Sequence, residues 1–331
     1  MAQPRIQLTE DDPGRTSTQV ILTFSHENFT DLYRVWRAAA SADGENAIQR
    51  QEDGRGGGKV QVIDWPSQQV LRSVDITLAT GFVQQDGLIV VCSYSSLELL
   101  DRDLRPVRTI THPLFCNLHS VAVHPAGWVV AASGIDALLL VSFHGEVSVL
   151  WDGGTCGYAQ LPDGSRRELD LSADHRQAYY RTSEQTTHVN GVEYWPERGS
   201  VLATLFHQGQ LIEVDGDGNT EVLIDGLTAP HSPRVRADGI VYLADSRSGR
   251  IVEYDPDSRS ARSIPLSEPC PWLQTVSWLP GERRYLAADS TNGRALMVAP
   301  DGTVTEQYTF HQDWRLHEAR GLAGPAIPTD A

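Results

Sequence analysis

The chain has 331 residues, of which 40% are hydrophobic, and a formal net charge of −16. These values are ordinary for a globular protein, and the acidic balance excludes a nucleic-acid-binding surface, which needs a basic face. No apolar run approaches the roughly 20 residues of a membrane-spanning helix, and the N-terminus lacks the regions of a signal peptide. We therefore expect a cytoplasmic protein with no nucleic-acid partner and no membrane partner.

The N-terminal part predicts three strands, at residues 18–24, 32–36 and 59–65. Residues 37–58 interrupt them and contain Asp-Gly-Glu-Asn and a Gly-Arg-Gly-Gly-Gly run. Such glycine-rich composition is typical of loops. We expect a flexible excursion between strands at residues 37–58.

Five units of similar length follow, at residues 78–112, 118–152, 187–226, 230–265 and 273–309. Each unit alternates short apolar strands with turns rich in Asp and Gly, as in Val-Tyr-Leu-Ala-Asp-Ser-Arg-Ser-Gly-Arg at 241–250. Repeats of about 40–45 residues with several such strands are typical of the four-stranded blades of a β-propeller. Blades cannot bury their faces singly, so we expect one domain over residues 1–331.

Two further segments complete this prediction. Residues 315–323 supply an inner strand that joins the N-terminal strands in a sixth blade, which closes the ring without leaving a free sheet edge. Residues 153–186 do not fit the repeat and are rich in arginine and tyrosine. Long loops in compact folds are often lids, so this segment predicts a lid-like insertion. The predicted fold is an all-β, six-bladed β-propeller whose two ends share one blade.

Four histidines occupy the same internal position of these units: His119, His188, His231 and His317. Gln274 takes this position in one unit, and the last four of the five positions are 43 residues apart each time. In the first unit, Ala79 or Thr80 takes the place instead. Because inner strands surround a central axis, equivalent positions face one another. The four histidines are therefore candidate ligands of one metal ion, although a single inward histidine is more often structural.

Several residues near these histidines are candidates for binding or catalysis. Glu318 could orient a ligand imidazole or act as a general base, unless it is a solvated residue at the blade edge. Arg234 and Arg320 could bind a carboxylate or phosphate of the substrate, unless strand alternation sends them between blades. Gln274 could bind substrate, and His175 on the insertion is a further catalytic candidate.

The segments Val-Asn-Gly-Val-Glu-Tyr-Trp-Pro-Glu-Arg-Gly at 189–199 and Asp-Gly-Ile-Val-Tyr-Leu-Ala-Asp-Ser at 238–246 resemble repeats of the SMP-30/gluconolactonase and NHL-repeat superfamily. The resemblance covers residues 75–310 and implies a six-bladed propeller. In the lactonase branch an axial calcium is held by carboxylate and asparagine side chains. Only Asn190 matches that pattern, which makes it a candidate substrate-binding residue. Because calcium prefers oxygen ligands and imidazole suits transition metals, we expect a divalent transition metal, zinc or iron.

The ligand arrangement is also similar to two other groups of propeller enzymes, whose sequence motifs do not occur here. Carotenoid-cleaving oxygenases hold iron on four histidines, and peptidylamidoglycolate lyases hold zinc on three. These analogies leave the activity open. The leading hypothesis is a redox-neutral lyase, isomerase or hydrolase acting on a small polar, anionic molecule. An iron-dependent oxygenase and a non-catalytic scaffold that binds protein or peptide are the alternatives.

Overall fold

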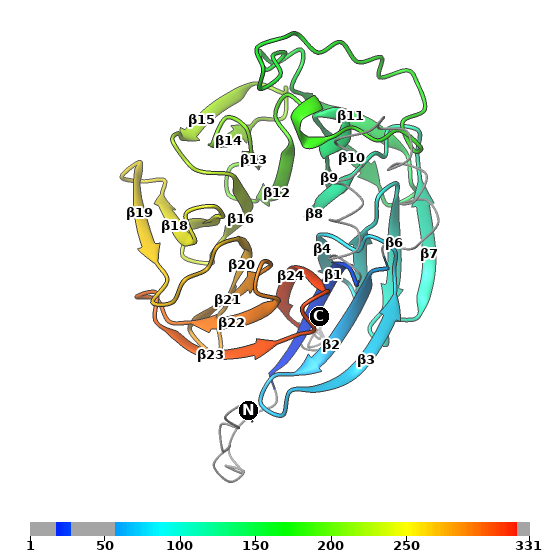
Figure 1. Ribbon diagram of the computed structural model, residues 1–331. Coiled ribbons are helices and arrows are strands. Elements are labelled where there is room, and N and C mark those ends of the chain that lie inside the picture. Colours follow the sequence, from blue (N-terminus) through cyan, green and yellow to red (C-terminus); the bar gives the residue numbers. More distant parts are fainter. Residues whose placement is uncertain (1–17, 28–56, 323–331) are drawn as a thin grey trace, which may run out of the picture.

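The computed structural model describes residues 18–27 and 57–322. Six antiparallel sheets of four strands each are arranged around a central axis (Figure 1). The prediction of an all-β, six-bladed propeller is confirmed. Only two short 3-10 helices occur in the described residues, η1 (Ser133–Ile135) and η2 (Thr182–Glu184).

Five blades are continuous in sequence and correspond to the five predicted units. The first two contain β4 (Phe82–Gln85), β5 (Leu88–Cys92), β6 (Ser96–Asp101) and β7 (Pro106–Thr111), followed by β8 (Leu118–His124), β9 (Gly127–Ala132), β10 (Ala137–Ser142) and β11 (Val147–Asp152). The third contains β12 (Val189–Trp195), β13 (Ser200–Leu205), β14 (Gln210–Val214) and β15 (Thr220–Ile224). The last two contain β16 (Pro230–Val235), β17 (Val241–Asp245), β18 (Arg250–Asp255) and β19 (Ser260–Pro265), followed by β20 (Leu273–Leu279), β21 (Arg284–Asp289), β22 (Arg294–Val298) and β23 (Val304–Thr309).

The sixth blade combines both ends of the described chain. Its strand order is β24 (Arg315–Gly321), β1 (Gln19–His26), β2 (Lys59–Asp64) and β3 (Gln69–Asp75), so that red β24 lies beside blue β1 (Figure 1). The predicted closure by shared terminal strands is confirmed. The outer strand β3 was not predicted from the sequence. The predicted strand at 32–36 and nearly all of the excursion at 37–58 lie outside the described residues.

The core lies between neighbouring blades. Second strands such as β9 and β13 are buried at every position, because both of their faces pack against adjacent sheets. Their sequences are therefore mostly apolar and do not alternate, and the buried Ser200 and Thr204 of β13 are hydrogen-bonded. Outer strands such as β7 and β19 are exposed at nearly every position.

All four cysteines are free thiols. Cys92, Cys116 and Cys270 are buried, and Cys156 is partly exposed. A helix with the length and apolar character to cross a bilayer is absent from residues 18–27 and 57–322.

Candidate functional site at the blade axis

Strand register defines the axial position in each blade. The first paired residue of an inner strand lies opposite the end of the second strand, as in Leu118 with Ala132 and Leu273 with Asp289. The next residue occupies the axial position, and in most blades a β-bulge interrupts the register there. The residues at this position are His119, Asn190, His231, Gln274 and His317.

His188 does not occupy this position, which corrects the alignment made from the 43-residue spacing. It precedes Val189, which pairs with Leu205, so Asn190 is the residue equivalent to His119. His188 adopts a left-handed backbone conformation with φ of 46°. The equal spacing of the sequence therefore hid a shift of two residues in this blade.

Gly81 takes the axial position in the blade of β4, rather than Ala79 or Thr80. The backbone of Cys92 pairs with both Thr80 and Gly81 just before β4 begins. A Cβ atom on Gly81 would lie 2.7 Å from the carbonyl oxygen of His119. Only glycine allows the backbones of these two blades to approach so closely.

The four histidine rings lie together around His119, and we call His119, His188, His231 and His317 the histidine cluster. The centroid of the His119 ring is 5.3 Å from that of His188, 5.7 Å from that of His231 and 4.7 Å from that of His317. His188, His231 and His317 are buried, and His119 is partly exposed. Across the described part of the chain, no three His, Cys, Asp or Glu side chains already have their donor atoms grouped as in a metal site.

Hydrogen bonds fix the ring orientation of two histidines. Nδ1 of His188 contacts Oε1 of Gln185, and Nδ1 of His231 lies 2.9 Å from the carbonyl oxygen of Ala229. A carbonyl oxygen can only accept, so Nδ1 of His188 carries the proton and Nε2 holds the lone pair, a tautomer that can bind a metal. Nδ1 of His231 also lies 2.7 Å from the hydroxyl group of Ser246, which can donate or accept, so Ala229 and Ser246 together orient this ring.

His317 and His119 have buried ring nitrogens without partners. Neither Nδ1 nor Nε2 of His317 makes a hydrogen bond to any described residue, and the same is true of Nδ1 of His119. Each buried nitrogen without a hydrogen bond lowers the stability of the folded state by about 1–3 kcal/mol, because it has lost its contact with water. Because buried polar groups are nearly always satisfied, these nitrogens mark the two rings as candidates for a further contact.

The histidine cluster is neutral at physiological pH. Burial lowers the pKa of His119 to about 4 and that of His231 to about 3. Burial, followed by the neighbouring histidines, holds the pKa values of His188 and His317 well below the ordinary range. Neutral imidazole is the form that coordinates a metal, so no proton must leave these rings before binding.

A cavity of about 180 Å³ adjoins the cluster. His119 and His317 line it together with His26, and the insertion contributes Tyr179 and Tyr180. None of the described residues that line it is Asp, Glu, Lys or Arg. His26 lies outside the repeat position and was not a candidate from the sequence.

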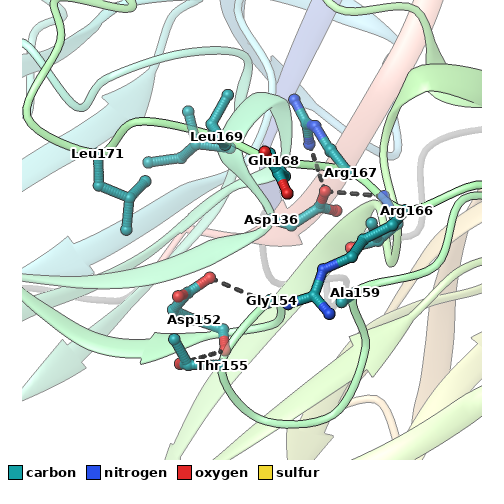
Figure 2. A pocket seen from close by; sticks show the side chains of 12 residues that line it. Asp136, Asp152, Gly154, Thr155, Ala159, Arg166, Arg167, Glu168, Leu169 and Leu171 are labelled. Carbon is teal, nitrogen blue, oxygen red and sulfur yellow. Dashed lines mark hydrogen bonds and ion pairs between the residues drawn. The ribbon is translucent and has the colours of Figure 1, made fainter.

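Asp136 attaches the insertion to the propeller. Its carboxylate, buried just after η1, accepts hydrogen bonds from the backbone N–H groups of Thr186, Thr187 and His188 at 2.8 to 2.9 Å. Arg167 of the insertion forms an ion pair with the same carboxylate, and Figure 2 shows this contact at the edge of a separate cavity of about 330 Å³. Asp136 therefore holds both the insertion and the backbone of a cluster histidine.

His175 lies within the insertion and not beside the cluster cavity. Its ring contacts the hydroxyl group of Tyr180 at 3.0 Å and the carbonyl oxygen of Asp170 at 2.9 Å, and its backbone N–H donates to Pro113. The ring is buried, at 3% exposure. In this position His175 orders the insertion, whereas the sequence analysis had considered it as a catalytic residue.

Glu318, Arg234 and Arg320 form a network that does not include the histidines. Oε1 of Glu318 accepts from Nη2 of Arg234 at 2.6 Å and from Nε of Arg320 at 2.5 Å, and Oε2 accepts from the N–H of Phe82. Burial opposes the ionisation of Glu318, but the two guanidinium groups outweigh it and lower its pKa. The sequence suggested a contact from Glu318 to a ligand imidazole and contacts from the arginines to a substrate at the metal. In the structure this network takes the place of both.

Gln274 and Asn190 occupy axial positions but have their own partners. Oε1 of Gln274 accepts from the indole N–H of Trp272 at 2.7 Å, and Oδ1 of Asn190 accepts from Thr204 at 2.8 Å. Neither residue lines the cluster cavity. The residues that sequence reasoning missed include Asp136, which lies near His188 only after folding, and Gln185, which precedes His188 by three residues.

No family model and no curated protein matches the sequence. Among solved structures, the chain is similar to a protein of unknown function from Bacteroides caccae, at 14% identity and a TM-score of 0.57 over 93% of this chain and 100% of that one. It is also similar to a chain of a nidogen/laminin complex, at 12% identity and a TM-score of 0.62 over 91% and 97% of the two chains. A virginiamycin B lyase from Staphylococcus aureus gives 8% identity and a TM-score of 0.50 over 70% and 69%. At these identities the comparisons establish a shared six-bladed propeller fold.

Proposed function

We propose that this protein is an enzyme in which the histidine cluster holds a divalent transition metal, zinc or iron, beside a small-molecule cavity. The leading form of the proposal is redox-neutral chemistry by a lyase, isomerase or hydrolase. The observation that carries it is His317, a buried imidazole with two unpartnered nitrogens whose ring lies 4.7 Å from that of His119. A metal ion would satisfy such a nitrogen where no protein group does.

The donor atoms of the histidine cluster suit a divalent transition metal. All four imidazoles are neutral at physiological pH, and the contact of Nδ1 with Gln185 leaves Nε2 as the lone-pair atom of His188. Second contacts of this kind are typical of metal-binding histidines. His317 makes no hydrogen bond to a described residue that would oppose rotation of its ring toward the others.

The protein's own residues would bind and enclose the substrate. Tyr179 and Tyr180 line the cavity from the insertion, and burial raises the pKa of both phenols. Both phenols therefore stay protonated at neutral pH. The hydroxyl group of Tyr180 is engaged with Nδ1 of His175, so Tyr179 is the residue that can donate a hydrogen bond to a polar substrate, while the insertion limits the access of water. When bound, a metal on neutral histidines supplies Lewis acidity that polarises a carbonyl or acidifies a water molecule.

The charge of the cavity changes the expected substrate. An anionic substrate was expected from the sequence because Arg234 and Arg320 follow two of the histidines closely. Both arginines instead line a different cavity. The described lining of the cluster cavity contains only apolar, hydroxyl, amide and neutral histidine side chains. We infer an uncharged polar substrate with a carbonyl or ester group.

An iron-dependent oxygenase is the second candidate function. The specific observation in its favour is that, among the described residues, no carboxylate lines the cavity beside the histidines. A four-histidine set without a carboxylate suits iron as well as zinc. The identity of the bound metal separates the two candidates.

Elemental analysis of the purified full chain tests the proposal. We expect about one zinc or iron ion per chain, with zinc favouring redox-neutral chemistry and iron favouring the oxygenase. His317→Ala should lose the metal, whereas His144→Ala, on an exposed turn, should retain it. Absence of stoichiometric metal, together with no change in melting temperature when zinc or Fe(II) is added, would refute the metal site and favour the binding scaffold.

A further inference from the structure

A further cavity, of about 560 Å³ and called the second cavity below, lies toward the other end of the inner strands. It shares no lining residue with the cluster cavity. In three inner strands we count three residues on from the position of His231, Gln274 and His317. This later position holds Arg234 in β16, Ser277 in β20 and Arg320 in β24. All three line this second cavity. The same strands therefore present a neutral imidazole layer at one end and a guanidinium layer at the other.

Two carboxylates lie against the guanidinium groups. Glu318 is shared by Arg234 and Arg320, and its side chain is 3% exposed. Glu193 is the other nearby carboxylate, and its Oε2 lies 3.5 Å from Nη1 of Arg234. Burial raises the pKa of Glu193, and the charges of Arg234 and Arg320 oppose this shift. Glu318 is hydrogen-bonded to both arginines.

Some guanidinium donors have no acceptor. Nε of Arg234 and Nη2 of Arg320 are buried and make no hydrogen bond to a described residue. The Arg234 side chain is 7% exposed and that of Arg320 is 15% exposed. Because buried arginines normally satisfy their five donors, this pair is organised as if to receive a further acceptor.

Other lining groups define what could occupy this cavity. The hydroxyl oxygen of Tyr242 accepts from the N–H of Trp278 at 2.8 Å, which leaves its own proton available to donate. Trp278 and Leu279 provide apolar surface. Glu282 also lines the cavity, but it is paired with Arg284 at 2.6 Å. One anionic group and an apolar body therefore match this lining, whereas a second negative charge would meet Glu282.

We propose that this second cavity binds a small monocarboxylate through Arg234 and Arg320. The planar guanidinium fork matches a carboxylate and forms charge-assisted hydrogen bonds with it. The site is separate from the histidine cluster and does not depend on a metal. In this protein of net charge −16, an anion would bind here because of the local geometry and not because of the overall field.

Titration calorimetry with benzoate and the full-length chain tests this proposal, with benzamide as the uncharged analogue of the same shape. We expect saturable binding of benzoate at constant ionic strength and no binding of benzamide. Equal binding of the two compounds, or no binding of benzoate, would overturn the proposal. This comparison uses the unmodified protein, so it does not depend on the folding of a variant.

Variants locate the site. Arg320→Gln should weaken benzoate binding about tenfold or more, since hydrogen bonds to charged groups contribute strongly. Arg105→Gln, at a side chain that is 74% exposed, should bind benzoate as the wild type does. His119→Ala should also leave benzoate binding unchanged, and a loss in that variant would place the carboxylate at the histidine cluster and contradict the proposal. Metal content is measured separately, so failure of this site is distinguishable from failure of the proposed function.

Discussion

His317 and Glu318 are consecutive residues of β24, yet they belong to different clusters. The ring of His317 lies 4.7 Å from that of His119, whereas the carboxylate of Glu318 binds Arg234 and Arg320. A β-bulge interrupts the register of β24 at His317, which directs its side chain and that of Glu318 to different clusters. The histidine cluster and the arginine network can therefore be perturbed independently.

Gln185→Ala should weaken zinc binding at the cluster by about tenfold to a hundredfold, because Gln185 fixes the tautomer of His188. The measurement is zinc affinity by competition with a chelator. Gln208→Ala is the matched control, since the Gln208 amide donates to the backbone of Thr186 at 2.9 Å. Equal zinc affinity in the two variants would show that Gln185 does not position His188 for a metal.

Asp136→Asn should loosen the insertion and destabilise the fold by about 3–5 kcal/mol, because the Arg167 charge loses its buried counter-ion. Limited proteolysis should then cut within residues 153–186, where the wild type resists cleavage. Asp174→Asn serves as the control on the same insertion, since the Asp174 side chain is 49% exposed. Identical cleavage patterns in both variants would contradict the role of Asp136 as an anchor.

Gly81→Ala should lower the free energy of unfolding by about 1–3 kcal/mol, as expected for overpacking. The new Cβ would lie 2.7 Å from both the carbonyl oxygen of His119 and Cα of Ser120, and backbone atoms yield less readily than side chains. Gly216→Ala is the control, because its Cβ would meet no atom within 4 Å. Urea denaturation measures both variants, and an unchanged midpoint for Gly81→Ala would argue against close packing at this position.

Cys116 should react with iodoacetamide very slowly at pH 8. Burial raises the pKa of its thiol to about 11, and the sulfur lies 3.4 Å from the carbonyl oxygen of Ala178 in the insertion. The thiolate is the reactive form, so the rate should rise about tenfold for each pH unit between 8 and 10. Peptide mapping by mass spectrometry follows Cys116 against the partly exposed Cys156. A rate that levels off near pH 9 would mean that the insertion does not bury this thiol.

The arrangement of the histidines was only partly predictable. The 43-residue spacing correctly indicated repeated blades, but it aligned His188 with a position that strand register assigns to Asn190. Sequence spacing counts residues, whereas register depends on bulges and on where pairing begins. The ring of His188 nevertheless lies 5.3 Å from that of His119, because Asp136 and Gln185 hold its backbone and its ring.

The positions of the arginines were not predictable from their place in the chain. Arg234 and Arg320 follow cluster histidines by three residues, and the sequence analysis already recognised that strand alternation could direct them elsewhere. Their partner Glu318 lies on β24, and Arg234 lies on β16, 84 residues earlier. Only closure of the ring brings these groups together, so no local pattern could have shown the network.

The sequence by itself determined six blades, most of their strands and the sharing of one blade by the two ends of the chain. These features follow from local rules, since alternation of apolar residues and turn-forming Asp and Gly act over a few residues. The tertiary structure alone decided which histidines meet, that His317 lacks partners, and that the arginines face a separate cavity. Those facts depend on register and on contacts between blades, where distances are set by packing around the whole ring.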